Sequence, residues 1–339
     1  MTPEDVVKRP VLEMYMQHPY PSYSRQEREQ IFAAELTRYH YLGLDKFLPG
    51  ARVLDVGCGT GHRVMPIAHH FGVKEYVGFD HSTSSLKVAR ELITELDFNQ
   101  AEVMEGDLFN LPFEDGRFDI VISQGVLHHT SDPYRGFKEL TRVCRPGGWV
   151  NIYLYNLYNH LRHNLQKARV SRLGGDDIHQ RFEVAHRLYG TKALDEMTPA
   201  EIAGFYDQYC HPHKSDHTIG ETLRWYKEQG FDYWGSYPAL GFRDFVGMAQ
   251  FRGRMLEKHP HIHTKVTQMV VRGAMMLPEM GSEWPPFRYP TLFHRFIWQA
   301  IYALQGSGGR YSGGPAFCGR KRETRDQASG STPMARASD

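Results

Sequence analysis

The chain has 339 residues, with 40 lysines and arginines against 39 aspartates and glutamates, so its formal net charge is +1. This balance argues against nucleic acid or another polyanion as the partner, because it produces no strong global field. The four cysteines lie far apart, the start lacks a secretory signal, and no apolar run approaches the roughly 18 residues of a membrane span. We therefore expect a cytoplasmic protein without a membrane span or a disulfide framework.

Residues 1–48 are expected to form an N-terminal helical segment that covers the rest of the fold as a lid. Apolar residues recur at helical spacing from Glu27 to Leu44, whereas Pro19 and Pro21 interrupt any helix before them. These prolines fix the backbone on either side of Tyr20 and favour a lid-like loop there.

Residues 49–155 alternate short apolar strands with helical stretches, an order that is typical of right-handed βαβ units and a parallel sheet. The sequence therefore predicts an α/β fold. The expected strands are Arg52–Val56, Glu75–Asp80, Ala101–Glu105, Phe118–Gln124 and Trp149–Tyr155.

Two long helical insertions are expected after this core, because charged and apolar residues follow helical spacing there with no convincing strand. Between and after them the pattern returns to core elements. In chain order we expect an insertion at 156–215, a core helix and sixth strand at 216–240, a second insertion at 241–312, a seventh strand at 313–322 and a disordered tail at 323–339.

A glycine loop follows the first expected strand, in the segment Val53-Leu54-Asp55-Val56-Gly57-Cys58-Gly59-Thr60-Gly61. A buried strand that leads into a tight turn before a helix is where α/β sheets bind nucleotide-like ligands. The spacing is G-x-G-x-G and not the G-x-G-x-x-G of a dinucleotide site, which favours a nucleoside without phosphates. Loop N–H groups could hold a carboxylate while Asp55 accepts from an ammonium. The alternative is a glycine turn with no ligand.

Acidic residues also close the second and third expected strands. Asp80 stands where a carboxylate accepts hydrogen bonds from ribose hydroxyls, although it could also cap the next helix together with Ser82. Asp107 could accept from an adenine amino group, although Gly106-Asp107 is also an ordinary turn. The acids become informative because they occur in register with the glycine loop.

These motifs resemble those of the class I S-adenosylmethionine-dependent methyltransferases of the small-molecule type. The segment Val126-Leu127-His128-His129 is similar to one in the quinone-biosynthesis branch of that family, and Glu139–Gly148 also matches. The resemblance covers about residues 50 to 155. It implies a Rossmann-like seven-stranded sheet, mostly parallel with the last strand antiparallel, and the long second insertion replaces the hairpin that is usual there.

The resemblance implies that the cofactor is S-adenosylmethionine and assigns roles around it. The methionine moiety would lie against the glycine loop and Asp55, the ribose near Asp80, the adenine near Asp107, and the sulfonium opposite Gln124. The cofactor-binding candidates are Asp55, Gly57, Cys58, Gly59, Gly61, Asp80, His81, Asp107, Leu108 and Gln124.

Methyl transfer from a sulfonium is an in-line displacement, so the protein must align the two reactants and exclude water. A hydroxyl or acidic C–H acceptor also requires a base, and His128 or His129, just past Gln124, could take the proton. The alternative is that one histidine packs on the sheet and the other caps a turn.

Aromatic residues near the expected acceptor pocket could attract the sulfonium and orient an acceptor. Tyr20 is the candidate catalytic tyrosine among them, and Tyr15, Tyr23, Tyr155 and Asn156 are candidate substrate contacts. The alternative is that most of these tyrosines only pack in the core or on the surface.

The segment His211-Pro212-His213-Lys214-Ser215-Asp216-His217 holds three histidines and an acid. We expect a polar loop that lines the acceptor pocket and no metal site, because Pro212 stiffens the loop and Lys214 repels a cation.

Residues 242–302 hold ten aromatics and six of the 13 methionines. They could line an adaptable apolar pocket, contact a membrane surface or a partner, or pack on the core.

We therefore expect methyl transfer from S-adenosylmethionine to a small or medium-sized acceptor, lipophilic or aromatic, with O-, N- and C-methylation all open. The expected partner is this small molecule and not nucleic acid, peripheral membrane contact is compatible with the sequence, and the oligomeric state is open. A non-catalytic cofactor-binding scaffold is the first alternative. A dinucleotide-dependent oxidoreductase is the second, and the glycine spacing disfavours it.

Overall fold

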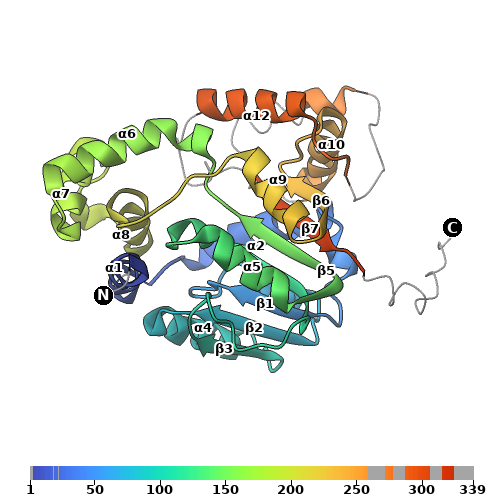
Figure 1. Ribbon diagram of the computed structural model, residues 1–339. Coiled ribbons are helices and arrows are strands. Elements are labelled where there is room, and N and C mark those ends of the chain that lie inside the picture. Colours follow the sequence, from blue (N-terminus) through green and yellow to red (C-terminus); the bar gives the residue numbers. More distant parts are fainter. Residues whose placement is uncertain are drawn as a thin grey trace, which may run out of the picture.

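The computed structural model describes residues 3–17, 19–21, 23–258, 272–277, 287–305 and 315–323. Figure 1 shows one twisted sheet with helices on both faces and a helical layer at one end. Most of the predicted tail, residues 324–339, and parts of the second insertion lie outside the described residues.

The sheet has seven strands in the order β3-β2-β1-β4-β5-β7-β6, and β7 is antiparallel to both of its neighbours. This is the predicted Rossmann-like arrangement. The strands are β1 (Arg52–Val56), β2 (Glu75–Asp80), β3 (Ala101–Glu105), β4 (Phe118–Gln124), β5 (Cys144–Tyr153), β6 (Phe231–Tyr237) and β7 (Ala316–Lys321).

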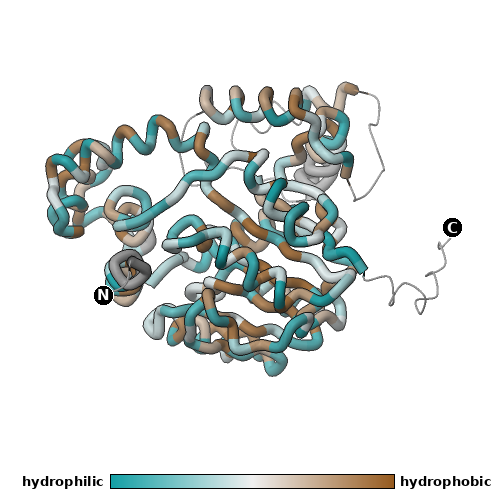
Figure 2. Tube along the Cα trace, viewed as in Figure 1, coloured by the Kyte–Doolittle hydropathy of each residue, from teal (hydrophilic) through white to brown (hydrophobic). Residues whose placement is uncertain are grey.

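The first four strands have the predicted bounds, although β3, at the edge of the sheet, is only half-buried or exposed. The other three are short, largely apolar runs that the sheet buries. Figure 2 shows these hydrophobic residues in the middle of the molecule. The expected start of β5 was wrong: the strand begins at Cys144 rather than Trp149. The segment before Trp149 still pairs with β4, across an irregularity between Phe118 and Ile120.

The crossover helices cover the two faces of the sheet. They are α3 (Met65–His70), α4 (Thr83–Glu95), α5 (Pro133–Val143) and α9 (Ile219–Glu228). The last three begin at side-chain caps, which are Ser82, Asp132 and Thr218. Each cap accepts a hydrogen bond from a first-turn N–H that the helix itself leaves without a partner.

The N-terminal segment contains α1 (Pro3–Gln17) and α2 (Arg25–Tyr41), with the short turn η1 (Leu44–Lys46) after them. The second helix ends before the expected Leu44, because Gly43 takes a left-handed conformation (φ 65°) that stops helical winding. The end of α1 lies on the start of α4, since the hydroxyls of Ser82 and Ser84 donate to the Tyr15 carbonyl over 3.3 and 3.1 Å.

The first insertion is helical, as predicted, and packs against α1 rather than standing alone. Its elements are α6 (Leu157–Gly174), α7 (Ile178–Tyr189), the short η3 (Leu194–Glu196), α8 (Pro199–Phe205) and a π-helix, η4 (Tyr206–Cys210). Met14 of α1 is buried in one cluster with Val170, Phe182 and Tyr209 of the insertion. The lid and the insertion therefore share a hydrophobic core.

The described part of the second insertion consists mainly of α10 (Phe242–Lys258) and α12 (Leu292–Gln305). Apolar residues follow helical spacing along α12, but Phe293 and Phe296 are 69% and 66% exposed. Instead, α12 packs through Tyr302, which is buried, and through Trp298, whose indole N–H donates to the Leu240 carbonyl over 2.8 Å. No described helix is long and apolar enough to cross a membrane.

Candidate functional site

The strand register brings the predicted cofactor residues to one edge of the sheet. Val56 at the end of β1 pairs with Phe79, Asp80 pairs with Glu105, and Gln124 pairs with Tyr153. The glycine loop, the strand-end acids and Gln124 therefore lie together at the carboxyl edge of the parallel strands, the usual ligand edge of such sheets.

The glycine loop is built for close approach. Gly57 and Gly59 both have φ in the left-handed region, at 75° and 54°. A Cβ on Gly57 would collide with Val126, and a Cβ on Gly59 would collide with the carbonyl oxygen of Tyr20. The glycines thus let the segment after β4 and the N-terminal lid approach the loop.

Asp80 ties this loop to α4. One carboxylate oxygen accepts from the Gly59 N–H over 2.8 Å, and the other accepts from the Ser82 N–H over 2.9 Å. Ser82 is the N-cap of α4, and Asp80 holds this cap residue through its main-chain N–H. His81 lies beside Asp80, with its Nδ1 3.8 Å from the carboxylate, and its Nε2 has no hydrogen-bond partner among the described residues.

Asp55 is buried beneath the loop, where the Tyr76 hydroxyl donates to it over 2.9 Å. Burial raises the pKa of Asp55 to about 7, because the low-dielectric interior disfavours its charged form. Cys58 is also buried, which raises the pKa of its thiol and keeps it protonated. The N–H of Gly61 closes the turn by donating to the Cys58 carbonyl over 2.9 Å.

Asp107, Leu108 and Gln124 complete the predicted cofactor set. Asp107 accepts from the Phe109 N–H over 2.9 Å, and Leu108 is half-buried against Gly136. The Gln124 side-chain N–H donates to Asn151 over 3.2 Å. The side-chain amide oxygen of Gln124 is buried and has no hydrogen-bond partner in the described part of the chain. A buried acceptor of this kind fits a cationic ligand at the strand edge.

A cluster of rings lies past the end of β4, and Asp207 of the π-helix is its polar centre. The Tyr15 hydroxyl donates to Asp207 over 2.8 Å, and the Tyr155 hydroxyl donates over 3.4 Å. Tyr155 stacks between His128 and His160, at centroid distances of 3.7 and 4.3 Å. Sequence reasoning missed Asp207, since it belongs to no local motif and reaches the site only through tertiary packing. Its π-helical setting is one that often marks functional sites.

The two candidate general bases, His128 and His129, have different surroundings. His128 is fully buried and accepts from the Tyr155 N–H over 3.4 Å, and burial lowers its pKa well below the usual value. His129 is also buried, with its Nε2 3.9 Å from an Asp207 oxygen. Burial lowers the pKa of His129 to about 4, although Asp207 opposes the shift. Both imidazoles are therefore neutral at physiological pH.

His211 joins this cluster from the predicted polar loop. It is fully buried and stacks on His129 at a centroid distance of 3.7 Å. His129, Asp207 and His211 each offer an atom of metal-ligand type, and these atoms lie within 4.8 Å of one another. The sequence indicated the loop but not this juxtaposition, because the three residues are brought together by the insertion.

The other predicted contacts have mixed environments. Tyr20 and Tyr23 are half-buried, and Tyr23 meets His62 edge-on at 6.4 Å. Burial raises the pKa of the Tyr20 hydroxyl well above its usual value, so it stays protonated. Asn156 is buried and caps α6, accepting from the N–H groups of Tyr158 and Asn159 over 3.1 and 3.4 Å.

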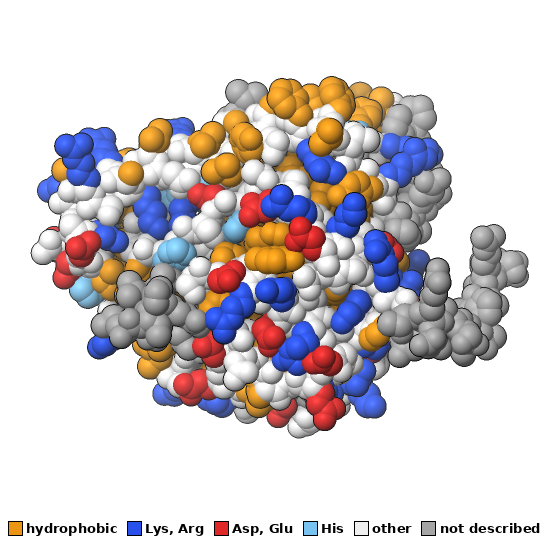
Figure 3. All heavy atoms as spheres, in the orientation of Figure 1, with side chains coloured by type: hydrophobic (Ala, Val, Ile, Leu, Met, Phe, Trp, Pro, Cys, Tyr) orange, Lys and Arg blue, Asp and Glu red, His pale blue; other side chains and the backbone are white. Residues whose placement is uncertain are grey.

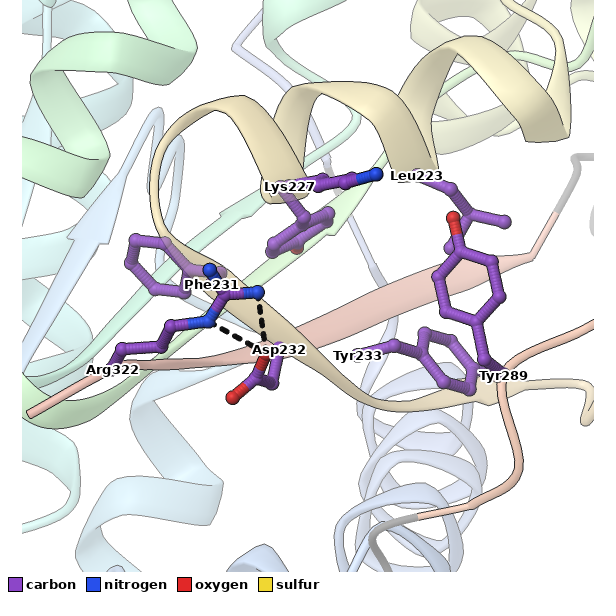
Figure 4. Close-up of a pocket in the computed structure, with 8 residues that line it drawn as sticks. Leu223, Lys227, Phe231, Asp232, Tyr233, Tyr289 and Arg322 are labelled. Carbon is purple, nitrogen blue, oxygen red and sulfur yellow. Dashed lines mark hydrogen bonds and ion pairs between the residues drawn. The ribbon is translucent and has the colours of Figure 1, made fainter.

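A separate pocket lies at the opposite end of the sheet. Figure 4 shows it between α9 and the start of β6, with Tyr289 on one side and the Asp232–Arg322 ion pair on the other. Phe231 pairs with Lys321, whereas the cofactor edge corresponds to Tyr237 and Ala316 at the other end of the same strands. This pocket is therefore not part of the candidate site.

Residues 54–152 match the family model described as a methyltransferase domain. A demethylmenaquinone methyltransferase of Bacillus cytotoxicus is 40% identical over 103 residues, which cover 30% of this chain and 44% of that protein. An uncharacterized protein of Synechococcus sp. is 27% identical over 267 residues, which cover 71% of this chain and 61% of that protein. The chain thus spans less than two thirds of the length of these curated relatives.

This chain is also similar to a solved structure from Haloferax volcanii, a methyltransferase in complex with the Trm112 methyltransferase activator. The TM-score between the two chains is 0.47, and their sequences are 15% identical. The match covers 94% of this chain and 96% of that chain. The family match falls on the part of the chain that holds the glycine loop, Asp80, Asp107 and Gln124. The chain therefore carries a class I S-adenosylmethionine-dependent methyltransferase domain, and S-adenosylmethionine is its cofactor.

Proposed function

We propose that this chain transfers a methyl group from S-adenosylmethionine to a small or medium-sized acceptor, lipophilic or aromatic, held against the ring cluster around Asp207. The observation that carries this proposal is that α1, the turn after β4, the segment after β5 and the π-helix all contribute rings or polar groups to one buried cluster. Four separate segments converge there beside the cofactor edge.

The residues at the strand edge fit the cofactor in the following way. Asp80 already accepts two main-chain N–H groups, and its remaining lone pairs would accept from ribose hydroxyls. The buried carbonyl oxygen of Gln124 would face the sulfonium, and Asp55 would accept from the methionine ammonium. Asp107 and Leu108 would border the adenine. The cofactor supplies a methyl group that is already activated, so the chain must align the acceptor and exclude water.

We assign the base to His129 in preference to His128. His129 is neutral, so its imidazole can accept a proton, and the nearby Asp207 carboxylate would stabilise the imidazolium that forms. Tyr20 keeps its proton, so it would orient the acceptor by donating a hydrogen bond rather than by acting as a base. Tyr15 and Tyr155 hold Asp207 in place, and Tyr23, within the lid, contacts His62.

An apolar and basic surface supports a lipophilic acceptor and peripheral contact with a membrane. Figure 3 shows hydrophobic side chains along the edge formed by α12 and α6. Exposed apolar residues on these packed helices are Leu161, Leu165, Leu292, Phe293 and Phe296. Arg162, Arg169 and Arg172 of α6 are exposed, Arg295 of α12 is half-buried, and neither helix carries an acidic residue. Exposed apolar and basic side chains on neighbouring helices favour an anionic lipid surface.

Isothermal titration calorimetry followed by a turnover assay tests the proposal. We expect S-adenosylmethionine and S-adenosylhomocysteine to bind, and S-adenosylhomocysteine to be released when a panel of hydroxy-, amino- and thiol-substituted naphthalenes is added. Binding without release for any acceptor would favour the scaffold function. Failure to bind either ligand, together with binding of a nicotinamide dinucleotide, would favour an oxidoreductase.

A further inference from the structure

The main chain of His213 contacts both stacked histidines of the cluster. Its carbonyl oxygen lies 3.2 Å from His129 Nδ1, and its N–H donates to His211 Nδ1 over 3.2 Å. The other ring nitrogens, His129 Nε2 and His211 Nε2, are buried and have no hydrogen-bond partner among the residues that the structure describes. The main chain of this one residue therefore contacts Nδ1 of both rings, but it offers a carbonyl oxygen to His129 and an N–H to His211.

These contacts fix opposite tautomers. A carbonyl oxygen only accepts, so His129 Nδ1 must carry the proton and His129 Nε2 must present a lone pair. A main-chain N–H only donates, so His211 Nδ1 must present the lone pair and His211 Nε2 must carry the proton. Burial lowers the pKa of both rings, which keeps both neutral and preserves the two tautomers.

We propose that His129 and His211 form a cradle for a hydroxyl group of the acceptor, in which His129 Nε2 takes the hydroxyl proton and His211 Nε2–H donates to the same oxygen. The acceptor is accordingly a phenol or an enol. This inference rests on the proposed methyl transfer and deepens it by naming the substrate class and by adding His211 as a catalytic residue.

The two rings stack at a centroid distance of 3.7 Å, so an acceptor oxygen would lie at the ring edges, beside the two Nε2 atoms, and not between the ring faces. The ligand-type atoms of His129, Asp207 and His211 lie within 4.8 Å of one another. Two hydrogen bonds of about 2.8 Å that meet at one oxygen can span such a distance. The low pKa of His129 also favours an acidic hydroxyl, because a weak base takes a proton readily only from a group that releases it easily.

The proton and electron balance is complete without a further reactant. The acceptor oxygen, or the conjugated carbon of the same phenol or enol, forms a bond to the methyl carbon as the carbon–sulfur bond breaks. The electron pair of that bond stays on sulfur. The hydroxyl proton moves to His129 Nε2, and Asp207, 3.9 Å away, offsets the new positive charge.

A metal centre on the same three residues fits the observed contacts less well. A metal ion would need a lone pair on His211 Nε2, but that atom carries the proton as long as Nδ1 accepts from the His213 N–H. The positive charge of Lys167 also acts on both rings and lowers their pKa, and it would repel a cation there. We therefore favour the hydroxyl cradle.

The first test reads the tautomers directly, without turnover. Protein labelled with ¹⁵N in histidine is examined at pH 7 by two-bond ¹⁵N–¹H correlation, and signals are assigned by their loss in His129→Gln and His211→Gln. We expect the Nδ1–H form for His129 and the Nε2–H form for His211. The reverse forms, or an imidazolium at either site, would overturn the proposal. So would stoichiometric Zn²⁺ binding that is lost in Asp207→Asn.

The second test separates the His211 N–H from the His211 ring. With 2-naphthol as acceptor, we expect His211→Phe, which keeps the stacking ring but has no donor, to lower kcat about 100-fold. His211→Gln keeps a donor N–H and should stay within about 10-fold of the wild type. The exposed His69→Gln is the matched control and should leave kcat unchanged.

Equal losses in the Phe and Gln variants, or no loss in either, would overturn the role of the His211 N–H. Methylation of 2-naphthylamine as fast as 2-naphthol, or no methylation of any naphthol tested, would overturn the substrate class. Calorimetry with S-adenosylhomocysteine runs beside these assays, and each variant should bind it as the wild type does. Loss of that binding in the wild type itself would instead contradict the proposed function.

Discussion

At the scale of single residues, Asp55 couples protonation to folding. Its pKa is raised to about 7 in the folded chain, whereas an unfolded aspartate titrates near its ordinary value. The folded state therefore holds a proton that the unfolded state has lost between about pH 4 and pH 7. Stability from this group is fully present below that window and is lost as the pH rises through it.

Urea denaturation at a series of pH values checks this directly. Without cofactor, the wild-type free energy of unfolding should fall as the pH rises from 5 to 7, by about 2 to 3 kcal/mol, and level off above about pH 8. Asp55→Asn cannot ionise and should flatten this part of the curve. An identical slope in both proteins would show that Asp55 does not carry the effect.

Asp80 should control cofactor affinity, because its carboxylate both holds the Gly59 N–H and would accept from ribose. Asp80→Ala removes a charged acceptor worth about 1.5 to 3 kcal/mol, which corresponds to roughly 10- to 150-fold weaker binding. Titration calorimetry with S-adenosylhomocysteine measures this loss. Asp232→Asn removes an exposed carboxylate at the opposite end of the sheet and serves as the control. Equal affinities in the two variants would contradict our placement of the ribose.

At the scale of elements, the segment 19–21 lies directly against the glycine loop. The Thr60 hydroxyl donates to the Pro21 carbonyl over 2.6 Å, next to the close approach of Gly59 and Tyr20. Thr60→Val keeps the side-chain shape but removes this hydrogen bond, worth about 1 kcal/mol. We expect faster amide hydrogen exchange in residues 19–24, measured by mass spectrometry. Thr37→Val, which removes a hydroxyl bond within α2, should leave exchange in that segment unchanged.

The exposed face of α12 should decide membrane contact. In sedimentation assays with vesicles that contain anionic lipid, we expect the wild type to bind and the pair Phe293→Ser with Phe296→Ser to bind at least about 10-fold more weakly, because apolar area drives insertion. Binding should also fall with added salt, since the basic side chains contribute. Wild-type and variant proteins that stay equally in solution would contradict this surface assignment.

Sequence patterns predicted elements more reliably than contacts. The strands β1 to β4 and helix α9 could be placed because apolar runs, caps and glycines act locally. The exposure of the apolar face of α12 could not be predicted, because an apolar stripe looks the same in the sequence whether it faces a core or solvent. The acids proposed to bind the cofactor could be placed at one edge of the sheet, because strand ends fix their position. Asp207 was not recognised, and His211 was expected only as part of a loop that lines the acceptor pocket. The contact of both with His129 could not be predicted, because the insertion brings them there over a long stretch of chain.

At the scale of the whole molecule, the lid and the first insertion behave as one body because they share a core. Met14 is buried against Val170 and Phe182, so Met14→Ala should lower the free energy of unfolding by about 2 to 4 kcal/mol. Hydrogen exchange should then quicken in both α1 and α7 and stay unchanged in β1. Faster exchange in α1 alone would show that the two parts move separately.

The π-helix makes the proposed acceptor side of the site sensitive to the gain or loss of a single residue. A π-turn contains one residue more than an α-turn, so removal of a single residue from 206–210 would restore ordinary winding. The wide turn absorbs the extra residue, so its removal would shift the side chains of residues 206–210 around the helix axis while the flanking segments keep their places. Asp207 and His211 could then no longer both face His129, while the methyl-donor edge would stay intact. Under the proposed function, one codon gained or lost could thus change which acceptors are methylated without touching the cofactor motifs.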